Sequence, residues 1–459
     1  MFRCRGCGRR IERPRLRCPY CRDLVLVPHK FDWKIDYDSL GIWRFSPMLP
    51  EFEVKNSLGE GFTPLVESIN LVKELKLEKL FFKDEGRNPT GSFRDRVAAL
   101  ITSHAKSVGA KTLVCATDGN TGASLAAYAA RLGLRVKAYV PRESDYAKII
   151  LMKSLGAEVI ARGETLDDVY NYVSRLVEEN PEYYNATSED NPLSIEALKT
   201  ISLELYMELG NNIDTIIVPV GSGLTLYSIY HGFRELYEHG LIKKIPRLIG
   251  VQSCSNPSIA LKLGISKKCD EKPIIGLAYE LPPLERETIE AIKESKGSVV
   301  VVHRKQVIEA AEMLAKKEGL FVEPAAAVAL AGLYEAVREY LVDKNDSIVL
   351  ILTGHGLKAY EAYFEATRKK QIPSRIFPKN TKMEIIRLLY EKEGLHGYSV
   401  WRELGLKVSV QAIYQHLNEL ERKGIVYSRV IGGKKHYYLT SKGKRIVELL
   451  NELSALLTL

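Results

Sequence analysis

The sequence predicts an α/β fold with parallel sheets, extended at the two ends by smaller modules. From about residue 35 to residue 368, short β-branched runs alternate with longer alanine-rich helical patterns. Two cysteine pairs occupy the first 21 residues, and helical periodicity returns after a proline-containing segment near residue 375. Strands that alternate with helices are typical of βαβ units and a parallel sheet.

Composition changes divide the chain into four parts. We expect a cysteine-rich module at 1–30, the α/β domain at 31–370, a linker at 371–380 and a separate tail domain at 381–459. A chain of 459 residues is too long for one core, so several units are expected.

Composition also favours a cytoplasmic protein without a membrane partner. The chain is 46% hydrophobic and 27% charged, and it has no apolar run of the ~18 residues that span a bilayer. Its net charge of +9 is concentrated at the ends, where residues 1–30 hold nine basic against two acidic residues. Residues 379–459 hold fourteen against eight, so the two ends are the candidates for contact with a polyanion.

The α/β pattern is clearest in the first half of the middle domain. Residues 112–116 predict a strand, residues 122–131 a helix and residues 135–140 a further strand. The apolar run at 348–352 predicts another buried strand.

Two CxxC pairs predict a structural zinc site. Cys4, Cys7, Cys18 and Cys21 place two knuckles ten residues apart, and four thiolates can close a tetrahedral site. A redox pair or a chance pairing is the alternative. The other three cysteines, Cys115, Cys254 and Cys269, are scattered, and we expect buried or incidental thiols there.

Six motifs in the middle domain follow one another in a diagnostic order. They are Gly59-Glu-Gly-Phe-Thr-Pro-Leu65, Lys83-Asp-Glu-Gly-Arg-Asn-Pro-Thr-Gly-Ser-Phe-Arg-Asp-Arg96, Thr117-Asp-Gly-Asn-Thr-Gly122, Val218-Pro-Val-Gly-Ser-Gly223, Gly319-Leu-Phe-Val-Glu-Pro-Ala325 and Thr353-Gly-His-Gly-Leu-Lys358. In this order they resemble the threonine synthase family over roughly residues 40–368. The resemblance implies the tryptophan-synthase-β-like fold of fold-type II pyridoxal-phosphate (PLP) enzymes, with two lobes of parallel sheet.

The resemblance also implies a cofactor site. The family's asparagine at Asn120 contacts the cofactor's ring oxygen, and its threonine at Thr353 faces the pyridine nitrogen. The turn at 221–223 leaves backbone N–H groups free to bind a phosphate, although an ordinary strand-to-helix turn would look the same. The implied cofactor-binding residues are Ser92, Arg94, Asn120, Thr121, Gly221, Ser222, Gly223, Leu224, Thr225 and Thr353.

The chain departs from the family at its catalytic lysine. Arg94 stands where the family has the lysine that forms the Schiff base and moves the proton. A guanidinium stays charged and non-nucleophilic at any working pH. We therefore expect no catalytic residue at this position and a PLP, PLP-like or other anionic ligand that binds without a covalent bond. A neighbouring lysine such as Lys83 could instead substitute.

A second departure lies at residues 191–200. The family reads Asn-Pro-x-Arg-x-x-Gly-x-Lys-Thr, whereas Ser194 and Ala197 replace the arginine and the glycine here. A hydroxyl cannot supply the charged, bidentate grip that arginine gives a substrate phosphate. Two departures at one site suggest a pocket with a changed task.

The tail predicts three helices, a β-hairpin and a last helix. Helical patterns at 383–390, 399–404 and 409–423 precede two strands, 425–431 and 436–439, around a basic turn at 432–435. A leucine-rich helix is expected from 443 to about 457.

This order resembles a winged helix-turn-helix module of the PadR type. Val410, Ile413, Leu417 and Leu420 would face its core. The residues expected to contact DNA are Ser409, Gln411, Ala412, Gln415, His416, Lys434 and Lys435. The alternative is a winged helix that binds proteins only, because such folds host both roles.

Three functions fit these patterns. The first is a ligand-sensing transcription regulator, a homodimer that binds DNA and a small molecule such as PLP, an amino acid or a phosphorylated amino acid. The second is an active threonine synthase or related PLP-dependent lyase with a regulatory or dimerising tail. The third is a binding or scaffold protein without either role. Because Arg94 removes the nucleophile and the tail is basic, the sequence favours the first, with enzyme activity uncertain.

Overall fold

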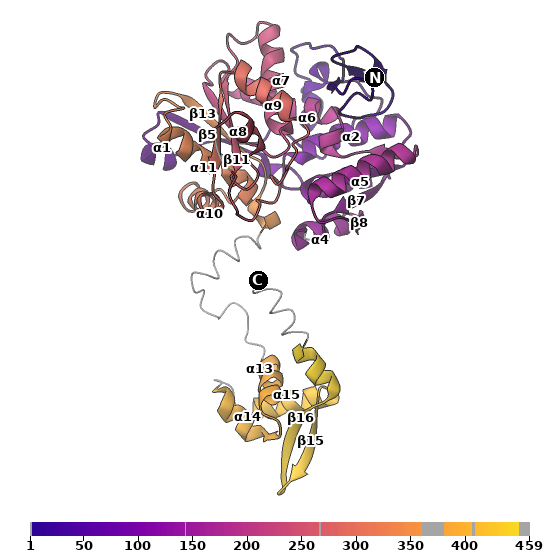
Figure 1. Ribbon diagram of the computed structural model, residues 1–459, viewed down its shortest axis with the longest axis vertical. Helices are drawn as coiled ribbons and strands as arrows, with labels where there is room; N and C mark the ends of the chain where they lie inside the picture. The colour runs from indigo at the N-terminus through magenta and orange to yellow at the C-terminus, as the bar shows by residue number, and fades with distance from the viewer. Residues whose placement is uncertain (1, 143, 266–267, 360–380, 406–408, 449–459) are drawn as a thin grey trace. The chain divides into compact units, whose positions relative to one another are not determined.

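The computed structural model describes residues 2–142, 144–265, 268–359, 381–405 and 409–448. The chain divides into two compact units, Met1–Ala366 and Thr367–Leu459, shown in Figure 1. The expected linker at 371–380 lies outside the described residues, and the three boundaries expected between the four parts stay predictions.

The first unit is built on two sheets. A six-stranded sheet has the order β12-β11-β10-β13-β5-β4, and a four-stranded sheet has the order β8-β7-β6-β9. All neighbours in both sheets pair in parallel except the edge strand β4, which pairs antiparallel with β5. The predicted α/β fold with two lobes of parallel sheet is thereby confirmed.

The strands of the larger sheet are β4 (Leu65–Glu67), β5 (Lys79–Asp84), β10 (Thr215–Pro219), β11 (Arg247–Ser253), β12 (Ser298–Val302) and β13 (Ser347–Leu352). Those of the smaller sheet are β6 (Thr112–Ala116), β7 (Arg135–Val140), β8 (Glu158–Ala161) and β9 (Tyr183–Asn185). The strands predicted at 112–116 and 135–140 are β6 and β7, and the run at 348–352 lies in β13. Central strands β6, β10 and β13 are buried along their whole length, which explains their continuous apolar runs.

Helices cover both sheets (Figure 1). They are α1 (Leu71–Glu74), α2 (Arg94–Ser107), α3 (Asn120–Leu132), α4 (Tyr146–Ser154), α5 (Leu166–Glu179), α6 (Leu193–Leu209), α7 (Leu224–Glu238), α8 (Ser258–Lys262), α9 (Glu285–Glu294), α10 (Arg304–Met313) and α11 (Pro324–Arg338). Short helical turns are η1 (Gly41–Met48), η2 (Glu85–Arg87), η3 (Ser188–Asp190), η4 (Leu314–Glu318) and η5 (Gly356–Ala359). The helix predicted at 122–131 lies within α3.

The N-terminal module forms a small antiparallel sheet in the order β2-β1-β3, from β1 (Phe2–Cys4), β2 (Arg10–Ile11) and β3 (Val25–Leu26). It packs on the first unit through ion pairs as well as apolar contacts. Arg17 Nη1 donates to Glu287 Oε1 of α9 at 2.6 Å, and the Glu287 side chain is fully buried. The module is therefore anchored to the α/β domain.

The second unit contains α13 (Thr381–Glu391), β14 (Leu395–His396), α14 (Gly397–Leu404), α15 (Val410–Arg422), β15 (Val426–Ile431) and β16 (Lys434–Leu439). Its sheet has the order β14-β16-β15 and is antiparallel. Ile413, Leu417 and Leu420 are buried as expected, whereas Val410 is only half-buried. The hairpin turn is shorter than expected, because Lys434 and Lys435 already pair in β16 with Ile431 and Val430.

The expected last helix is described in part. Residues 441–448 are helical, and the rest of the predicted 443–457 segment lies outside the described residues. None of the described helices has both the length and the apolar character required to cross a membrane.

Candidate functional site

A pocket lies between the two lobes of the first unit. Eight of the ten residues that the sequence assigns to a cofactor line this pocket: Arg94, Asn120, Thr121, Gly221, Ser222, Gly223, Thr225 and Thr353. Ser92 and Leu224 are fully buried and are not part of its lining. The fold therefore gathers the dispersed motifs around one cavity, although the role of each residue stays a prediction.

The turn before α7 forms one wall of the pocket. Gly221, Ser222 and Gly223 follow β10 and lead into the first turn of α7, whose N–H groups have no partner within the helix. Gly223 has a positive φ of 84°, and a Cβ there would lie 2.2 Å from Thr288 Oγ1. Only glycine fits this position, and the turn it permits presents an electropositive helix end to the pocket.

Arg94 projects into the pocket from the first residue of α2. Its Nη2 atom donates to Glu189 Oε1 at 2.5 Å, and the two side chains are 11% and 4% exposed. Its guanidinium also lies 4.7 Å from the centre of the Phe93 ring. The Nη1 atom is buried and has no hydrogen-bond partner. One terminal nitrogen of the guanidinium is therefore paired within the protein, and the other is available to donate a hydrogen bond to an anion.

Asn120 begins α3 on another side of the pocket. Its Nδ2 atom donates to Glu323 Oε1 at 3.0 Å, while its buried Oδ1 atom has no partner. Glu323 also pairs with the buried Lys148, whose Nζ atom lies 3.4 Å from Glu323 Oε2. Burial lowers the pKa of Lys148, but the carboxylates of Glu323 and Asp118 outweigh it and raise the pKa. The Asn120 amide is thus fixed by a buried ion pair with its oxygen left free.

The described residues that line the pocket include no lysine. Lys83 lies elsewhere, because its Nζ atom contacts Glu204 Oε2 at 2.9 Å and Glu208 Oε1 at 3.0 Å in the core. Lys358 contacts the segment that leads to Arg94, since its Nζ atom donates to Ser92 Oγ at 3.4 Å. Burial outweighs the attraction of Glu323 and Asp95 and lowers the pKa of Lys358 to about 8.

Several lining residues escaped the sequence analysis. They are Phe93, Ala116, Thr117, Asp118, Glu189, Pro219, Gly276, Leu277, Tyr279, Glu323 and Ala325. Glu323 and Asp118 belong to motifs already noted, so their position in the family pattern was a usable signal. No sequence signal pointed to Glu189 or Tyr279, because only the tertiary fold brings them to Arg94.

Ser194, which stands where the family pattern has an arginine for the substrate phosphate, is fully buried in the first turn of α6. Its hydroxyl has no hydrogen-bond partner, and the residue is not part of the pocket lining. Ser194 therefore cannot make the charged contact that the family pattern assigns to an arginine at this position.

Comparison with known proteins identifies the family. The model of the pyridoxal-phosphate-dependent enzyme family matches residues 56–354, the part of the chain that builds both lobes and the pocket. The chain belongs to the pyridoxal-phosphate-dependent enzyme family. Its relatives include a threonine synthase of Methanocaldococcus jannaschii, 35% identical over 73% of this chain and 85% of that protein. A threonine synthase of Methanosarcina acetivorans is 31% identical over 78% of this chain and 92% of that protein.

Solved structures of other proteins share the fold. An O-acetylserine-dependent cystathionine β-synthase of Helicobacter pylori has 24% identity and a TM-score of 0.56, over 66% of this chain and 95% of that one. A hydrogen sulfide-producing enzyme of Fusobacterium nucleatum has 22% identity and a TM-score of 0.55, over 65% of this chain and 97% of that one. At this identity the match demonstrates the two-lobed fold and no more.

These relatives overturn the main functional expectation. The expected ligand-sensing transcription regulator is wrong, because the chain matches threonine synthases at 31–35% identity over most of their length. The comparisons likewise give no support to an inactive, DNA-binding pseudoenzyme. That expectation rested on the replacements at Arg94 and Ser194 and on the basic tail, although eight of the ten residues assigned to the cofactor line one pocket. The alternative, a PLP-dependent enzyme, agrees better with the relatives.

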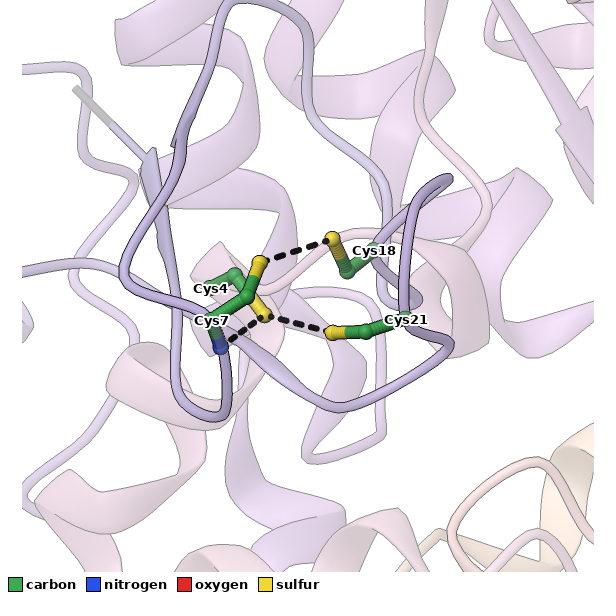
Figure 2. A group of neighbouring side chains, drawn as sticks. All are labelled: Cys4, Cys7, Cys18 and Cys21. Atoms are coloured by element: carbon green, nitrogen blue, oxygen red, sulfur yellow. Dashed lines mark hydrogen bonds between the residues drawn. The ribbon is translucent and has the colours of Figure 1, made fainter.

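A second candidate site is the cysteine cluster of the N-terminal module (Figure 2). The sulfur atoms of Cys4, Cys7, Cys18 and Cys21 all lie within 4.8 Å of one another. Cys4 Sγ is 3.3 Å from Cys21 Sγ, and Cys7 Sγ is 3.8 Å from Cys18 Sγ. Zn–S bonds of about 2.3 Å place tetrahedral sulfurs roughly 3.8 Å apart. The four atoms therefore have the spacing of a closed thiolate site.

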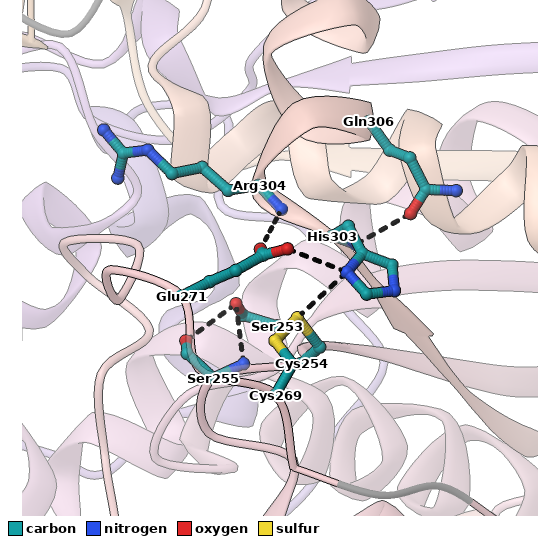
Figure 3. Close-up of a disulfide and its surroundings, with 8 residues drawn as sticks. All are labelled: Ser253, Cys254, Ser255, Cys269, Glu271, His303, Arg304 and Gln306. Carbon is teal, nitrogen blue, oxygen red and sulfur yellow. Dashed lines mark hydrogen bonds and ion pairs between the residues drawn. A yellow bond between two sulfur atoms is a disulfide. The ribbon is translucent and has the colours of Figure 1, made fainter.

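One cysteine expectation is wrong. Cys254 and Cys269 were expected to be incidental thiols, but the structure joins them in a disulfide across 15 residues (Figure 3). Sequence spacing carried no sign of this pairing, because the loop between them folds back on the end of β11. Cys115 is a free, buried thiol, as expected.

Proposed function

We propose that this chain is an active PLP-dependent enzyme that acts on an amino-acid substrate, as a threonine synthase or a related lyase. The observation that carries the proposal is the preserved pocket between the lobes, in a chain that is 35% identical to a threonine synthase. The tail would regulate the enzyme or hold two chains together.

The pocket fits the cofactor in three respects. The N–H groups in the first turn of α7 have no carbonyl partner within the helix, so this helix end suits a phosphate. Asn120 Oδ1 and Arg94 Nη1 are buried polar atoms without partners, and a buried polar group of this kind costs free energy unless a ligand or water satisfies it. Thr353 supplies a hydroxyl on the remaining side. A phosphorylated pyridine with polar ring substituents would satisfy all three sets.

PLP, when bound, supplies an electron sink that stabilises negative charge on the substrate carbon. The protein would supply orientation and charge. The α7 turn would hold the phosphate, Asn120 would fix the ring, and Arg94 Nη1 would attract an anionic group. Because arginine cannot form an imine, cofactor binding would depend on these non-covalent contacts alone.

The lysine of the family also moves a proton, and Arg94 cannot take over that task. Lys358 is the group we assign to it, because its Nζ atom reaches Ser92 Oγ at 3.4 Å, two residues before Arg94. With a pKa of about 8, an appreciable fraction of its amine is neutral at neutral pH.

Turnover by the full-length chain tests this proposal. The protein is supplied with PLP and O-phosphohomoserine, and release of threonine and phosphate is measured against the same protein without PLP. Serine and threonine are tested in parallel, with release of ammonia as the signal of a lyase. PLP-dependent turnover of any of these substrates supports the proposal, whereas tight PLP binding with no turnover of any would contradict it.

Borohydride treatment followed by peptide mass spectrometry tests the mode of cofactor binding. We expect no PLP fixed to the chain. A PLP adduct on Lys358 or Lys83 would instead show that another lysine replaces the missing one.

We further propose that the N-terminal module is a zinc ribbon. Its four sulfurs support this reading, because two CxxC knuckles on a small antiparallel sheet suit a structural zinc ion with no open coordination position. The ion would stabilise a module too short to have an extensive core of its own.

The tail is proposed to be a winged-helix module that pairs two chains in a homodimer. The order of α13, α14, α15 and the β15–β16 hairpin supports this, as does the exposure of Tyr390, Tyr398 and Tyr414 on its helices. Ser409 caps α15 by accepting a hydrogen bond from the Ala412 amide at 3.2 Å. A DNA contact by Gln411, Gln415 or the other residues assigned to one stays an untested prediction.

A further inference from the structure

A second group of metal-ligand side chains lies at the ends of two neighbouring strands of the larger sheet. Cys254 follows β11, which ends at Ser253, and His303 follows β12, which ends at Val302. Cys269 and Glu271 come from the loop after α8. None of these residues belongs to the lining of the candidate pocket.

The four side chains converge on one point. One potential ligand atom from each of Cys254, Cys269, Glu271 and His303 lies within 4.8 Å of the other three. His303 Nδ1 is 3.3 Å from Cys254 Sγ and 2.9 Å from Glu271 Oε1. Figure 3 shows the imidazole nitrogen turned toward both the sulfur and the carboxylate.

The surrounding backbone fixes this arrangement. Glu271 Oε2 accepts a hydrogen bond from the Arg304 amide at 2.8 Å, which leaves Oε1 turned to His303. The His303 amide donates to Gln306 Oε1 at 2.7 Å, so the histidine backbone is held at the start of α10. Outer contacts of this kind orient the ligands of protein metal sites.

We propose that Cys254, Cys269, Glu271 and His303 bind one divalent cation of the zinc class when the disulfide is reduced. A dithiol would supply two electrons and two protons, which break the S–S bond and leave two thiols, and would itself become a cyclic disulfide. The cation would then displace the thiol protons and bind two thiolates, an imidazole and a carboxylate. This mixture of soft and borderline ligands suits zinc better than calcium or magnesium.

The site would control a loop that lines the candidate pocket. Gly276, Leu277 and Tyr279 follow Glu271 within eight residues and contribute to the pocket lining. They lie in a segment without helix or strand. The ion would tie the start of this segment to the ends of β11 and β12, whereas the disulfide ties it to the end of β11 alone.

Metal content of the full-length protein tests the proposal. The chain is purified with zinc under dithiothreitol, freed of reductant and excess metal, and analysed for zinc per chain. We expect two zinc ions in the wild type and one in His303→Ala or Cys269→Ser. A matched variant of the other cysteine cluster, Cys7→Ser, should retain the zinc of this second site.

An unchanged metal content in both His303→Ala and Cys269→Ser would overturn the proposal, provided that circular dichroism shows them folded. So would a reduced wild type that holds only the zinc lost in Cys7→Ser. A second measurement does not depend on those variants folding: cobalt added to the reduced Cys4→Ser, Cys7→Ser double variant should give thiolate-to-cobalt absorption. Re-oxidation by diamide should abolish it, and its absence from the reduced protein would contradict the site.

Discussion

Arg94 Nη2 donates to Glu189 Oε1 at 2.5 Å inside the pocket between the two lobes. The pair places a permanent positive charge where the threonine synthase pattern implies a lysine, and Glu189 balances it. Because both side chains are nearly buried, the charge of Arg94 is screened little by solvent. Arg94 Nη1 can still donate to an anion, but Arg94 itself cannot hold PLP by a covalent bond.

Replacing Arg94 by lysine is expected to restore covalent cofactor binding. In Arg94→Lys, borohydride should fix one PLP per chain at residue 94, and turnover should rise about 100-fold, the lower part of the range for a positioned acid–base group. Arg87→Lys, at a residue whose side chain is 62% exposed, is the matched control and should change neither quantity.

Glu189 is expected to limit that gain. A carboxylate beside an amine favours its protonated form, so Glu189→Gln in the Arg94→Lys background should lower the pKa of the new lysine and increase turnover near neutral pH further. The pH profile of turnover measures this shift. A double variant whose profile matches that of Arg94→Lys would contradict the role given to Glu189.

Glu60 is expected to make stability fall as the pH rises. Burial outweighs the hydrogen bonds from Tyr128 and Leu58 and raises the pKa of this carboxyl from 4.5 to about 7. The folded state therefore binds more protons than the unfolded state between pH 4.5 and pH 7, and the stability that this provides is lost across that window. This pKa difference lowers the free energy of unfolding by about 3 kcal/mol across that window.

Urea unfolding at pH 5 and pH 7.5 measures this effect. Glu60→Gln removes the titration, so the wild type should lose more stability than the variant between the two values. Equal losses in both proteins would mean that Glu60 is not the group responsible.

Removal of one zinc ligand should destabilise the N-terminal module. Cys7→Ser leaves three thiolates, so the chain should lose one zinc ion and the module should become sensitive to proteases. Zinc analysis and limited proteolysis check this. Tyr20→Ala, at an exposed residue next to Cys21, should leave the zinc content unchanged. Full zinc retention in Cys7→Ser would argue against the four-sulfur site.

The tail should determine the oligomeric state. If it pairs two chains, the full protein should sediment as a dimer and a chain that ends at residue 366 should sediment as a monomer. The first unit has its own sheets and core, so the shortened chain is expected to fold. A dimer of unchanged stability after truncation would show that the first unit makes the interface.

Local pattern was sufficient for two strands of the smaller sheet. The strands at 112–116 and 135–140 were predicted to the residue, because each is a short segment rich in apolar residues with glycine or proline on either side. The hairpin turn at 432–433 was placed less well, because two glycines allow a tighter turn than the basic residues after them suggested. The function was predicted wrongly from the replacements at Arg94 and Ser194 and from the basic tail, because such local features do not outweigh similarity to threonine synthases over most of their length.

By itself, the sequence determined the α/β class, the order of the motifs and the four cysteines of the N-terminal knuckles, because each depends on residues close together in the chain. Only the tertiary structure brought Glu189 to Arg94, 95 positions away, and Tyr279 to the same pocket. It alone paired Cys254 with Cys269 beside His303. Such contacts depend on how loops return to the ends of parallel strands, and that geometry is set by the packing of the whole sheet.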